Sequence, residues 1–163
     1  MSMRNFVPED LPVIVDIANR AWREIKKMSR EALGDRLSDM LNPGGDDVYK
    51  GKQIEAFAAA KPENIFICEE EGRIVGFITF NIYDCGIGEI SNNAVDPDCG
   101  LKGIGQQMYR AVLEHFRKTG LKAAKVNTGL DYAHAPARRA YERAGFNRKL
   151  EHVTYYLDLE EMP

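Results

Sequence analysis

The sequence predicts one mixed α/β domain that spans residues 1–163. Residues 8–60 carry apolar side chains at helical spacing, whereas residues 64–95 are rich in the Ile, Val and Phe that favour strands. After residue 100, segments with a helical period alternate with segments of strand character. Helices, then antiparallel strands, then strand–helix units are expected to form a central mixed sheet with helices packed against it.

The N-terminal part is expected to contain one short strand and three helices. Residues 8–10, Pro-Glu-Asp, form a helix-start signal ahead of an apolar stripe that continues to Ile25. Ser29 suits the N-cap of a second helix, and the run Asn-Pro-Gly-Gly at residues 42–45 interrupts the chain before a third. The expected elements are a strand over residues 3–7 and helices over residues 8–25, 29–41 and 48–60.

The rest of the chain is expected to begin with antiparallel strands and then to alternate strands with helices. Glu71-Gly72 separates two runs of strand formers and indicates a hairpin. Apolar residues recur every four positions from Ile104 to Phe116, which indicates an amphipathic helix, and Gly145 suits the end of the next helix. The expected strands cover residues 64–70, 73–83, 87–95, 121–128 and 153–157, and the expected helices cover residues 104–120 and 136–144.

Composition and short motifs exclude several classes of protein. A net charge of −3 argues against nucleic-acid binding, which needs a basic face. The N-terminus lacks the apolar core of a signal peptide, and the longest apolar run, residues 74–80, is too short to cross a bilayer. The three cysteines form no C-x-x-C pair, and no H-E-x-x-H motif is present. We therefore expect a cytoplasmic protein with reduced cysteines, no nucleic-acid or membrane partner and no metal.

The run AVDPDCGLKGIG, residues 94–105, places three glycines directly before the amphipathic helix. Gly100, Gly103 and Gly105 follow the order G-x-x-G-x-G, whereas dinucleotide-binding turns have G-x-G-x-x-G and P-loops have G-x-x-x-x-G-K-[ST]. Both of those nucleotide-binding interpretations fail on spacing. A helix N-terminus behind glycines still suits a phosphate, because its first N–H groups are unpaired and carry partial positive charge. A tight turn into a core helix is the alternative interpretation.

A second motif, HAPARRAYERAGF at residues 134–146, follows one strand after that helix. Together the two stretches resemble the GNAT superfamily of N-acetyltransferases, which has V-x-P, then [QR]-x-x-G-x-[GA], then N-x-x-A-x-x-x-Y-x-x-x-G-F. The resemblance covers nearly the whole chain and implies a twisted central sheet of about six or seven strands flanked by helices. The matching positions are Val95, Pro97, Gly103, Gly105, Ala137, Tyr141, Gly145 and Phe146.

The resemblance also implies a cofactor, acetyl-CoA, bound between two splayed strands that correspond here to residues 87–95 and 121–128. It places the pyrophosphate at the helix N-terminus and the pantetheine arm along residues 93–95, rather as an added strand. The Val95 amide is then the donor to the thioester carbonyl. The residues assigned to acetyl-CoA by the resemblance are Asn93, Ala94, Val95, Gly100, Leu101, Lys102, Gly103, Ile104, Gly105, Gln106, His134, Ala137, Arg138 and Tyr141.

The sequence departs from the family pattern at three of these positions. Gly100 and Leu101 stand where Arg or Gln and then Gly are usual, so the turn lacks a polar side chain that normally braces the pyrophosphate loop. His134 replaces an Asn that bonds the pantetheine arm, a role that a neutral imidazole can also fill. Lys102 and Arg138 suit phosphate contacts or, alternatively, solvated surface charges.

For catalysis, the resemblance implies direct attack of an amine on the thioester, without a covalent enzyme intermediate. Tyr141 is the expected general acid, because a phenol of pKa about 10 can protonate a departing thiolate. A purely structural packing role is the alternative for this residue. Glu89 occupies a strand position from which some members recruit a base, often through water, although it also suits an ordinary surface glutamate. Asp131, Tyr132 and His134 are lesser candidates for the base.

The acceptor implied by the resemblance is a primary amine of a small molecule or a peptide. The alternatives are modification of a protein N-terminus or lysine, and a non-catalytic module that binds acyl-CoA. A homodimer is expected by analogy with relatives. Residues 31–47 are acidic, which suits either attraction of a cationic amine or a solvated helix face. The acidic residues are Glu31, Asp35, Asp39, Asp46 and Asp47, and the aromatic residues that suit either the acceptor pocket or the core are Trp22, Tyr49, Phe57 and Tyr83.

Overall fold

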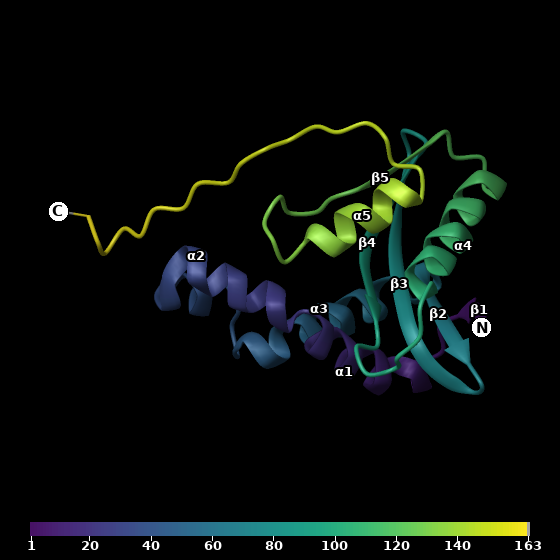
Figure 1. Cartoon of the computed structure of the whole chain (residues 1–163), viewed down its shortest axis with the longest axis horizontal. Helices are drawn as coiled ribbons and strands as arrows, with labels where there is room; N and C mark the ends of the chain where they lie inside the picture. Colours follow the sequence, from purple (N-terminus) through teal and green to yellow (C-terminus); the bar gives the residue numbers. More distant parts are fainter. Residues whose placement is uncertain (163) are drawn as a thin grey trace.

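The structure, a computed structural model, describes residues 1–162 of the chain and contains a five-stranded sheet (Figure 1). The strands lie in the order β1-β2-β3-β4-β5, and neighbours are antiparallel except β4 and β5, which are parallel. This mixed sheet confirms the predicted α/β class. The strands are β1 (Ser2–Asn5), β2 (Ile65–Glu70), β3 (Arg73–Tyr83), β4 (Ile87–Val95) and β5 (Ala123–Val126).

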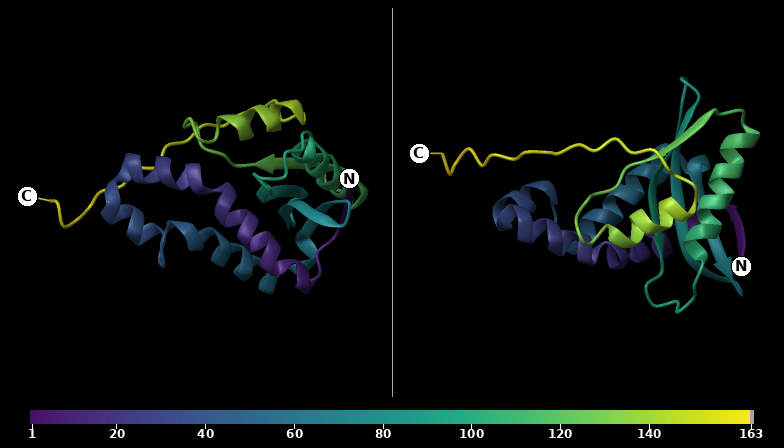
Figure 2. Two further views of the ribbon diagram at one scale, coloured as in Figure 1. Left: turned by 60° about the horizontal axis from the view of Figure 1, so that its bottom comes forward. Right: turned by 45° about the horizontal axis from the view of Figure 1, so that its top comes forward.

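Helices cover both faces of the sheet (Figure 2). The helix that follows the glycine turn, α4, packs Met108 against Phe80 on one face, and the N-terminal helices α1 and α3 pack Ile17 and Ile54 against Phe77 on the other. Phe77 and Phe80 point to opposite faces because side chains alternate along a strand. The helices are α1 (Leu11–Ala21), α2 (Arg23–Leu41), α3 (Asp46–Ala60), α4 (Ile104–Lys118) and α5 (Ala135–Arg143), with 3-10 turns at Pro8–Asp10 and Pro62–Asn64.

The N-terminal helices do not break where the apolar pattern predicted. Trp22 has non-helical φ and ψ of −88° and 0°, so α1 ends at Ala21 and α2 begins at Arg23. Ser29, the predicted N-cap, therefore lies inside α2. The kink in this helix falls at Gly34, whose φ of +77° is readily adopted only by glycine. The spacing of apolar residues predicts which face of a helix is buried. It does not predict a kink when the same face stays buried on both sides of that kink.

The strand predicted over residues 153–157 does not form, and this explains why the sheet has five strands instead of six or seven. The segment is extended and exposed, with Tyr155 88% exposed. Arg36 of α2 binds Asp158 at 2.7 Å and also pairs with Glu160, so the C-terminal segment reaches α2 near its end, and it extends away from β5 (Figure 1). A β-strand forms only where another strand pairs with it through backbone hydrogen bonds. The residue pattern of 153–157 suggested a strand but could not show that such a partner is present.

Candidate functional site

The site begins where β4 and β5 separate. Their parallel pairing runs from Ile87 opposite Ala123 to Ile90 opposite Val126, and β5 ends there. β4 continues to Val95 while pairing with β3 on its other side. The edge of β4 over residues 91–95 is therefore open toward the ends of β5 and α5, which is the splay that the family resemblance implied.

A β-bulge lies at the point of separation. Between the pairs Phe80–Ile90 and Ile78–Asn93, β3 supplies the single residue Thr79, whereas β4 supplies two residues, Ser91 and Asn92. The fully buried Thr79 hydroxyl accepts hydrogen bonds from the backbone N–H of Asn92 at 2.9 Å and from its side-chain amide at 3.0 Å. The extra residue bends the strand beside the site, a placement that is common for bulges.

The backbone of β4 beyond the bulge presents hydrogen-bonding groups to the open side. The Asp96 N–H donates to the Val75 carbonyl at 2.9 Å, so the backbone of Asp96 faces β3. Backbone groups of successive strand residues point in opposite directions, which turns the N–H and C=O of Val95 and of Asn93 toward the gap. The Ala94 backbone faces β3 by the same alternation.

The start of α4 forms the next wall. Gly103 precedes the helix with a left-handed φ of +84°, and no side chain caps the helix. Gly103, Gly105 and Gln106 line the cavity, so the unpaired N–H groups of this first turn are open to an anion. Ile104 is buried in the core instead. Gly100, Leu101 and Lys102 are exposed and lie outside this cavity lining.

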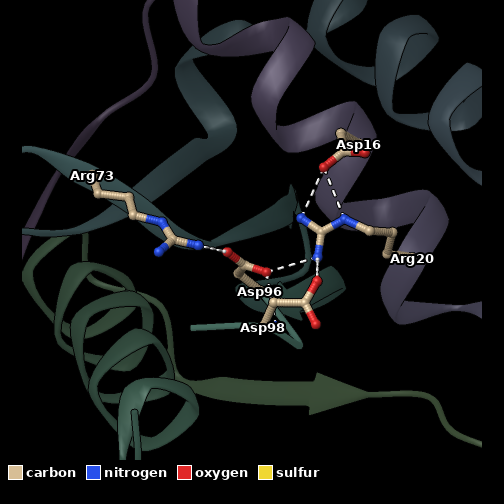
Figure 3. Close-up of polar contacts among 5 residues, drawn as sticks. All are labelled: Asp16, Arg20, Arg73, Asp96 and Asp98. Carbon is tan, nitrogen blue, oxygen red and sulfur yellow. Dashed lines mark hydrogen bonds and ion pairs between the residues drawn. The ribbon is translucent and has the colours of Figure 1, made fainter. Parts of the chain in front are cut away.

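A charged cluster holds the turn between β4 and α4 in place (Figure 3). Asp96, only 4% exposed, accepts hydrogen bonds at 2.7 Å from Arg20 of α1 and from Arg73 of β3, and Arg20 also binds Asp98 at 2.8 Å. Burial alone would raise the pKa of Asp96, but the hydrogen bonds from Arg20, from the Asp98 amide and from Arg73 outweigh it and lower that pKa. The cluster therefore fastens the turn to α1 and β3.

These elements enclose a cavity of about 480 Å³. It reaches from the first turn of α4, past the open edge of β4, to α1, α2 and α3. Of the predicted cofactor residues, Asn93, Ala94, Val95, Gly103, Gly105, Gln106, His134, Ala137 and Tyr141 line it.

Tyr141 is held at the centre of this wall. The Asn93 side chain donates from Nδ2 to the Tyr141 hydroxyl at 2.9 Å and accepts at Oδ1 from the Tyr109 hydroxyl, also at 2.9 Å. Burial raises the pKa of Tyr141 above its ordinary value, against the smaller lowering effect of the hydrogen bonds to Asn93 and Tyr109. Because its oxygen accepts the bond from Asn93, the Tyr141 hydroxyl keeps its own proton available for donation toward the cavity.

His134 and Arg138 lie on the helix that carries Tyr141 but have different surroundings. The Nδ1 atom of His134 lies 2.7 Å from Asp131, so Nδ1 is the nitrogen that donates to this carboxylate, and in the neutral imidazole Nε2 is the acceptor. Arg138 instead donates to the backbone carbonyls of Gly129 at 2.6 Å and Asp131 at 2.7 Å. It therefore braces the loop before α5, and the structure does not bring it to the cavity.

Glu89, the predicted base, also lies outside the cavity lining. Its carboxylate accepts hydrogen bonds from Asn127 at 3.1 Å and from the Tyr83 hydroxyl, and it lies 3.4 Å from Lys125. Asn127 does line the cavity. The connection between Glu89 and the cavity is therefore indirect and passes through the Asn127 side chain.

The acidic residues of α2 and α3 do not face the cavity either. Arg30 binds Asp46 at 2.8 Å, Asp35 at 3.0 Å and Asp39 at 2.7 Å, which balances much of their charge. No Asp or Glu from residues 1–162 belongs to the cavity lining. Within residues 1–162, no three His, Cys, Asp or Glu side chains are grouped so that they could hold a metal ion. No helix of this part of the chain is both long and apolar enough to cross a membrane.

Several cavity residues escaped the sequence interpretation. Tyr109 is one position of the amphipathic helix and gives no sign of its bond to Asn93. Lys50 of α3 and Arg143 of α5 also line the cavity, although isolated cations on helices usually indicate only a solvated face. Trp22 was predicted for either the pocket or the core, and it lines the cavity. Tyr109 and Lys50 belong to no motif, and Arg143 occupies a position that the pattern of residues 134–146 leaves variable.

Comparison with known proteins connects this geometry to one family. The model of the acetyltransferase (GNAT) family matches residues 22–146. S-(2-succino)cysteine N-acetyltransferase of Bacillus subtilis (strain 168) is 33% identical over an alignment of 163 residues, which covers 93% of this chain and 90% of that relative.

Two further matches differ in how much of each chain they cover. Mycothiol acetyltransferase of Thermomonospora curvata is 34% identical over 94 residues, or 58% of this chain, and this chain covers only 31% of the length of that relative. The crystal structure of a GNAT family acetyltransferase from Brucella melitensis in complex with acetyl-CoA matches with a TM-score of 0.60 at 21% identity, over 90% of this chain and 82% of that one. This structural match shows the fold.

Proposed function

This chain belongs to the GNAT family of acetyltransferases, and we propose that residues 1–163 form one catalytic domain that transfers acetyl from acetyl-CoA directly to the primary amine of a small molecule. The observation that carries the proposal is the composition of one cavity wall. The open edge of β4, the uncapped start of α4 and the Tyr141 hydroxyl all face the same space.

The residues of the cavity fit acetyl-CoA. The pyrophosphate fits the first turn of α4, because Gly103 and Gly105 present no side chains there and the N–H groups have no cap. The pantetheine arm fits along the open backbone of Asn93 and Val95, and the Nε2 atom of His134 can accept one of its amide hydrogens. Arg143 lines the same cavity and supplies a cation toward the phosphates.

Acetyl-CoA, when bound, supplies the acetyl group as an activated thioester. The Val95 N–H is the donor that stabilises negative charge on the carbonyl oxygen. Tyr141 holds the proton that the departing sulfur takes, and the raised pKa keeps this phenol protonated at neutral pH. For removal of a proton from the amine, Glu89 acting through water stays a prediction. His134 Nε2 is the second candidate, as an alternative to its bond with the pantetheine arm.

Two relatives support a small acceptor. The Bacillus relative, which matches almost the full length of this chain, is named for an amino acid, and the Thermomonospora relative is named for mycothiol. Modification of a protein N-terminus or lysine and a non-catalytic acyl-CoA-binding role are the competing outcomes. A cytoplasmic location and a homodimer stay predictions.

Two measurements test the proposal together. Calorimetry measures acetyl-CoA binding, and a thiol-release assay measures turnover over amino acids, polyamines and peptides with a free N-terminus or lysine. Binding with release on small amines supports the proposal, whereas release on peptides alone points to a protein acetyltransferase. Binding without release on the whole panel favours the non-catalytic module, and failure to bind acetyl-CoA contradicts the proposed function.

A further inference from the structure

Lys50 stands on the wall of the cavity opposite the glycine turn. It projects from α3, and its Nζ lies 4.4 Å from the centre of the Trp22 ring. The same nitrogen donates to Asn92 Oδ1 at 2.7 Å and to Gln53 Oε1 at 3.1 Å. Lys50 and Trp22 line the cavity together with Ile25. The ammonium group is therefore held by neutral partners next to the bulge of β4.

No carboxylate of the described chain balances this charge. Arg20, Arg30 and Arg36 each form ion pairs with Asp or Glu, whereas within residues 1–162 Lys50 forms none. Burial, and to a lesser degree repulsion from Lys26, lowers the pKa of Lys50 to about 8. Most Lys50 side chains are still cationic at pH 7, so the cavity contains a partly desolvated charge without a counter-ion.

The position of Lys50 separates it from the phosphate-binding end. The first turn of α4 lies on one side of β4, and α3 lies with α1 and α2 on the other (Figure 1). The two ends of the cavity meet at the bulge, where Asn92 bonds Lys50 and the next residue, Asn93, bonds Tyr141. An anion at Lys50 thus lies on the far side of the reacting centre from the cofactor phosphates.

We propose that Lys50 is a specificity-determining residue that binds a carboxylate of the acceptor, so that the acceptors of this enzyme are amines that also carry a carboxylate. This inference rests on the proposed acetyltransferase function. An amine without a carboxylate enters a cavity that has a lysine and no acidic side chain, which is unfavourable for an ammonium ion. A carboxylate on the acceptor forms a charge-assisted hydrogen bond with Lys50, and this attraction favours binding.

The kinetic test uses paired acceptors, each α-amino acid being compared with its carboxamide. Wild type is expected to prefer the carboxylate form. The variant Lys50→Met, which keeps the packing on Trp22, should raise KM for the carboxylate form by about tenfold to a hundredfold and abolish the preference. Lys50→Arg should retain the preference. Lys52→Met, on an exposed position of the same helix, is the matched control and should behave as wild type.

The outcomes of this test separate the possibilities. A preference that persists in Lys50→Met, or a best acceptor without a carboxylate, contradicts the proposal. Loss of kcat at unchanged KM in both Lys50 variants also contradicts it and assigns Lys50 to proton removal. Absence of turnover with every amine, despite acetyl-CoA binding, contradicts the proposed acetyl transfer and leaves the carboxylate site to be judged by a second measurement.

The second measurement needs no turnover. NMR of ¹³C-methylated lysines follows the pKa of Lys50 in the complex with CoA while succinate or succinamide is added, with Lys50→Arg used to assign the signal. A bound carboxylate favours the charged amine, so succinate should raise the pKa of Lys50 and succinamide should leave it unchanged. An unchanged pKa at high succinate contradicts carboxylate binding, and an unchanged spectrum on addition of CoA itself marks failure of the proposed function instead.

Discussion

The two ends of the cavity are built from different parts of the chain. At the end proposed for the cofactor phosphates, the cavity wall consists of backbone: the open edge of β4 and the first turn of α4 present N–H groups past Gly103 and Gly105. At the end proposed for the acceptor, side chains of α1, α2 and α3 and of Trp22, which joins α1 to α2, line the cavity beside the bulge of β4, and Lys50 is one of them. A site made of backbone groups needs glycines at a fixed spacing, which the sequence displays. A site made of side chains from several helices depends on how those helices pack against the strand, which the sequence does not display.

The largest expected effect comes from a charge placed at the phosphate end. Gly105→Asp puts a carboxylate on the first turn of α4, where it competes for the N–H groups and repels phosphate. We expect a loss of acetyl-CoA affinity of about 100-fold or more, measured by calorimetry. Stability should change little, because an added Cβ meets Tyr109 at an ordinary 3.7 Å and an acidic residue suits a helix start.

Leu101→Asp is the matched control for that variant, because Leu101 is exposed in the same turn and lies outside the cavity lining. An exposed charge there is screened by solvent, so affinity should change by less than about fivefold. Equal losses in the two variants would mean that the whole turn, and not the start of α4, holds the phosphates.

Where the two ends meet, Tyr141→Phe should lower kcat about 100-fold and leave the KM for acetyl-CoA nearly unchanged. The raised pKa of Tyr141 means that wild-type activity declines only at a pH above the ordinary tyrosine range, and the variant should lack that decline. A pH–rate profile measures both effects. Tyr109→Phe removes the hydroxyl that bonds Asn93 and interacts with Tyr141 but leaves the Tyr141 hydroxyl in place, so it should cost less. An equal loss in this variant would instead indicate a positioning role for Tyr141.

A smaller effect is expected where the turn is fastened. Asp96→Asn removes the charge that binds Arg20 and Arg73 and should lower the free energy of unfolding by on the order of 2 kcal/mol at pH 7. The pKa of Asp96 is lowered in the folded state, so its contribution is present above the unfolded pKa of about 4 and is lost as pH falls through the folded value.

Urea unfolding at pH 7 and in acid measures the difference between wild type and Asp96→Asn. The two proteins should converge in acid, because the protonated aspartic acid resembles asparagine. A gap that stays constant with pH would show that the lost stability is not tied to the carboxylate charge.

The smallest effect is expected at the bulge. Thr79→Val is nearly isosteric but leaves the Asn92 N–H without its acceptor, which should lower the free energy of unfolding by about 1 to 2 kcal/mol. Because Asn92 also bonds Lys50, KM for the acceptor should rise while acetyl-CoA affinity is kept. Thr79→Ser retains the hydroxyl and should restore the acceptor KM, and a loss of acetyl-CoA affinity in Thr79→Val would show that the two ends are not independent.

Sequence patterns predicted much of the phosphate end. The period of apolar residues after Ile104 placed α4, and the glycines before it predicted an anion site at its start. Nine of the predicted cofactor residues line the cavity, as found above. Arg138 does not, because the carbonyl groups of the preceding loop take its donors, and those carbonyls lie near it only in the folded chain.

Local sequence was thus enough for the features that depend on neighbouring residues: the mixed α/β class, the hairpin, α4 and the family motif that includes Tyr141. Folding decided the features that depend on distant segments. Thr79 and Asn92 bond across two strands at the bulge, Arg36 of α2 pairs with Asp158 of the C-terminal segment, and α3 brings Lys50 to the cavity. Periodicity describes which way a residue faces along its own element, whereas partners and charge balance arise from segments far apart in the sequence.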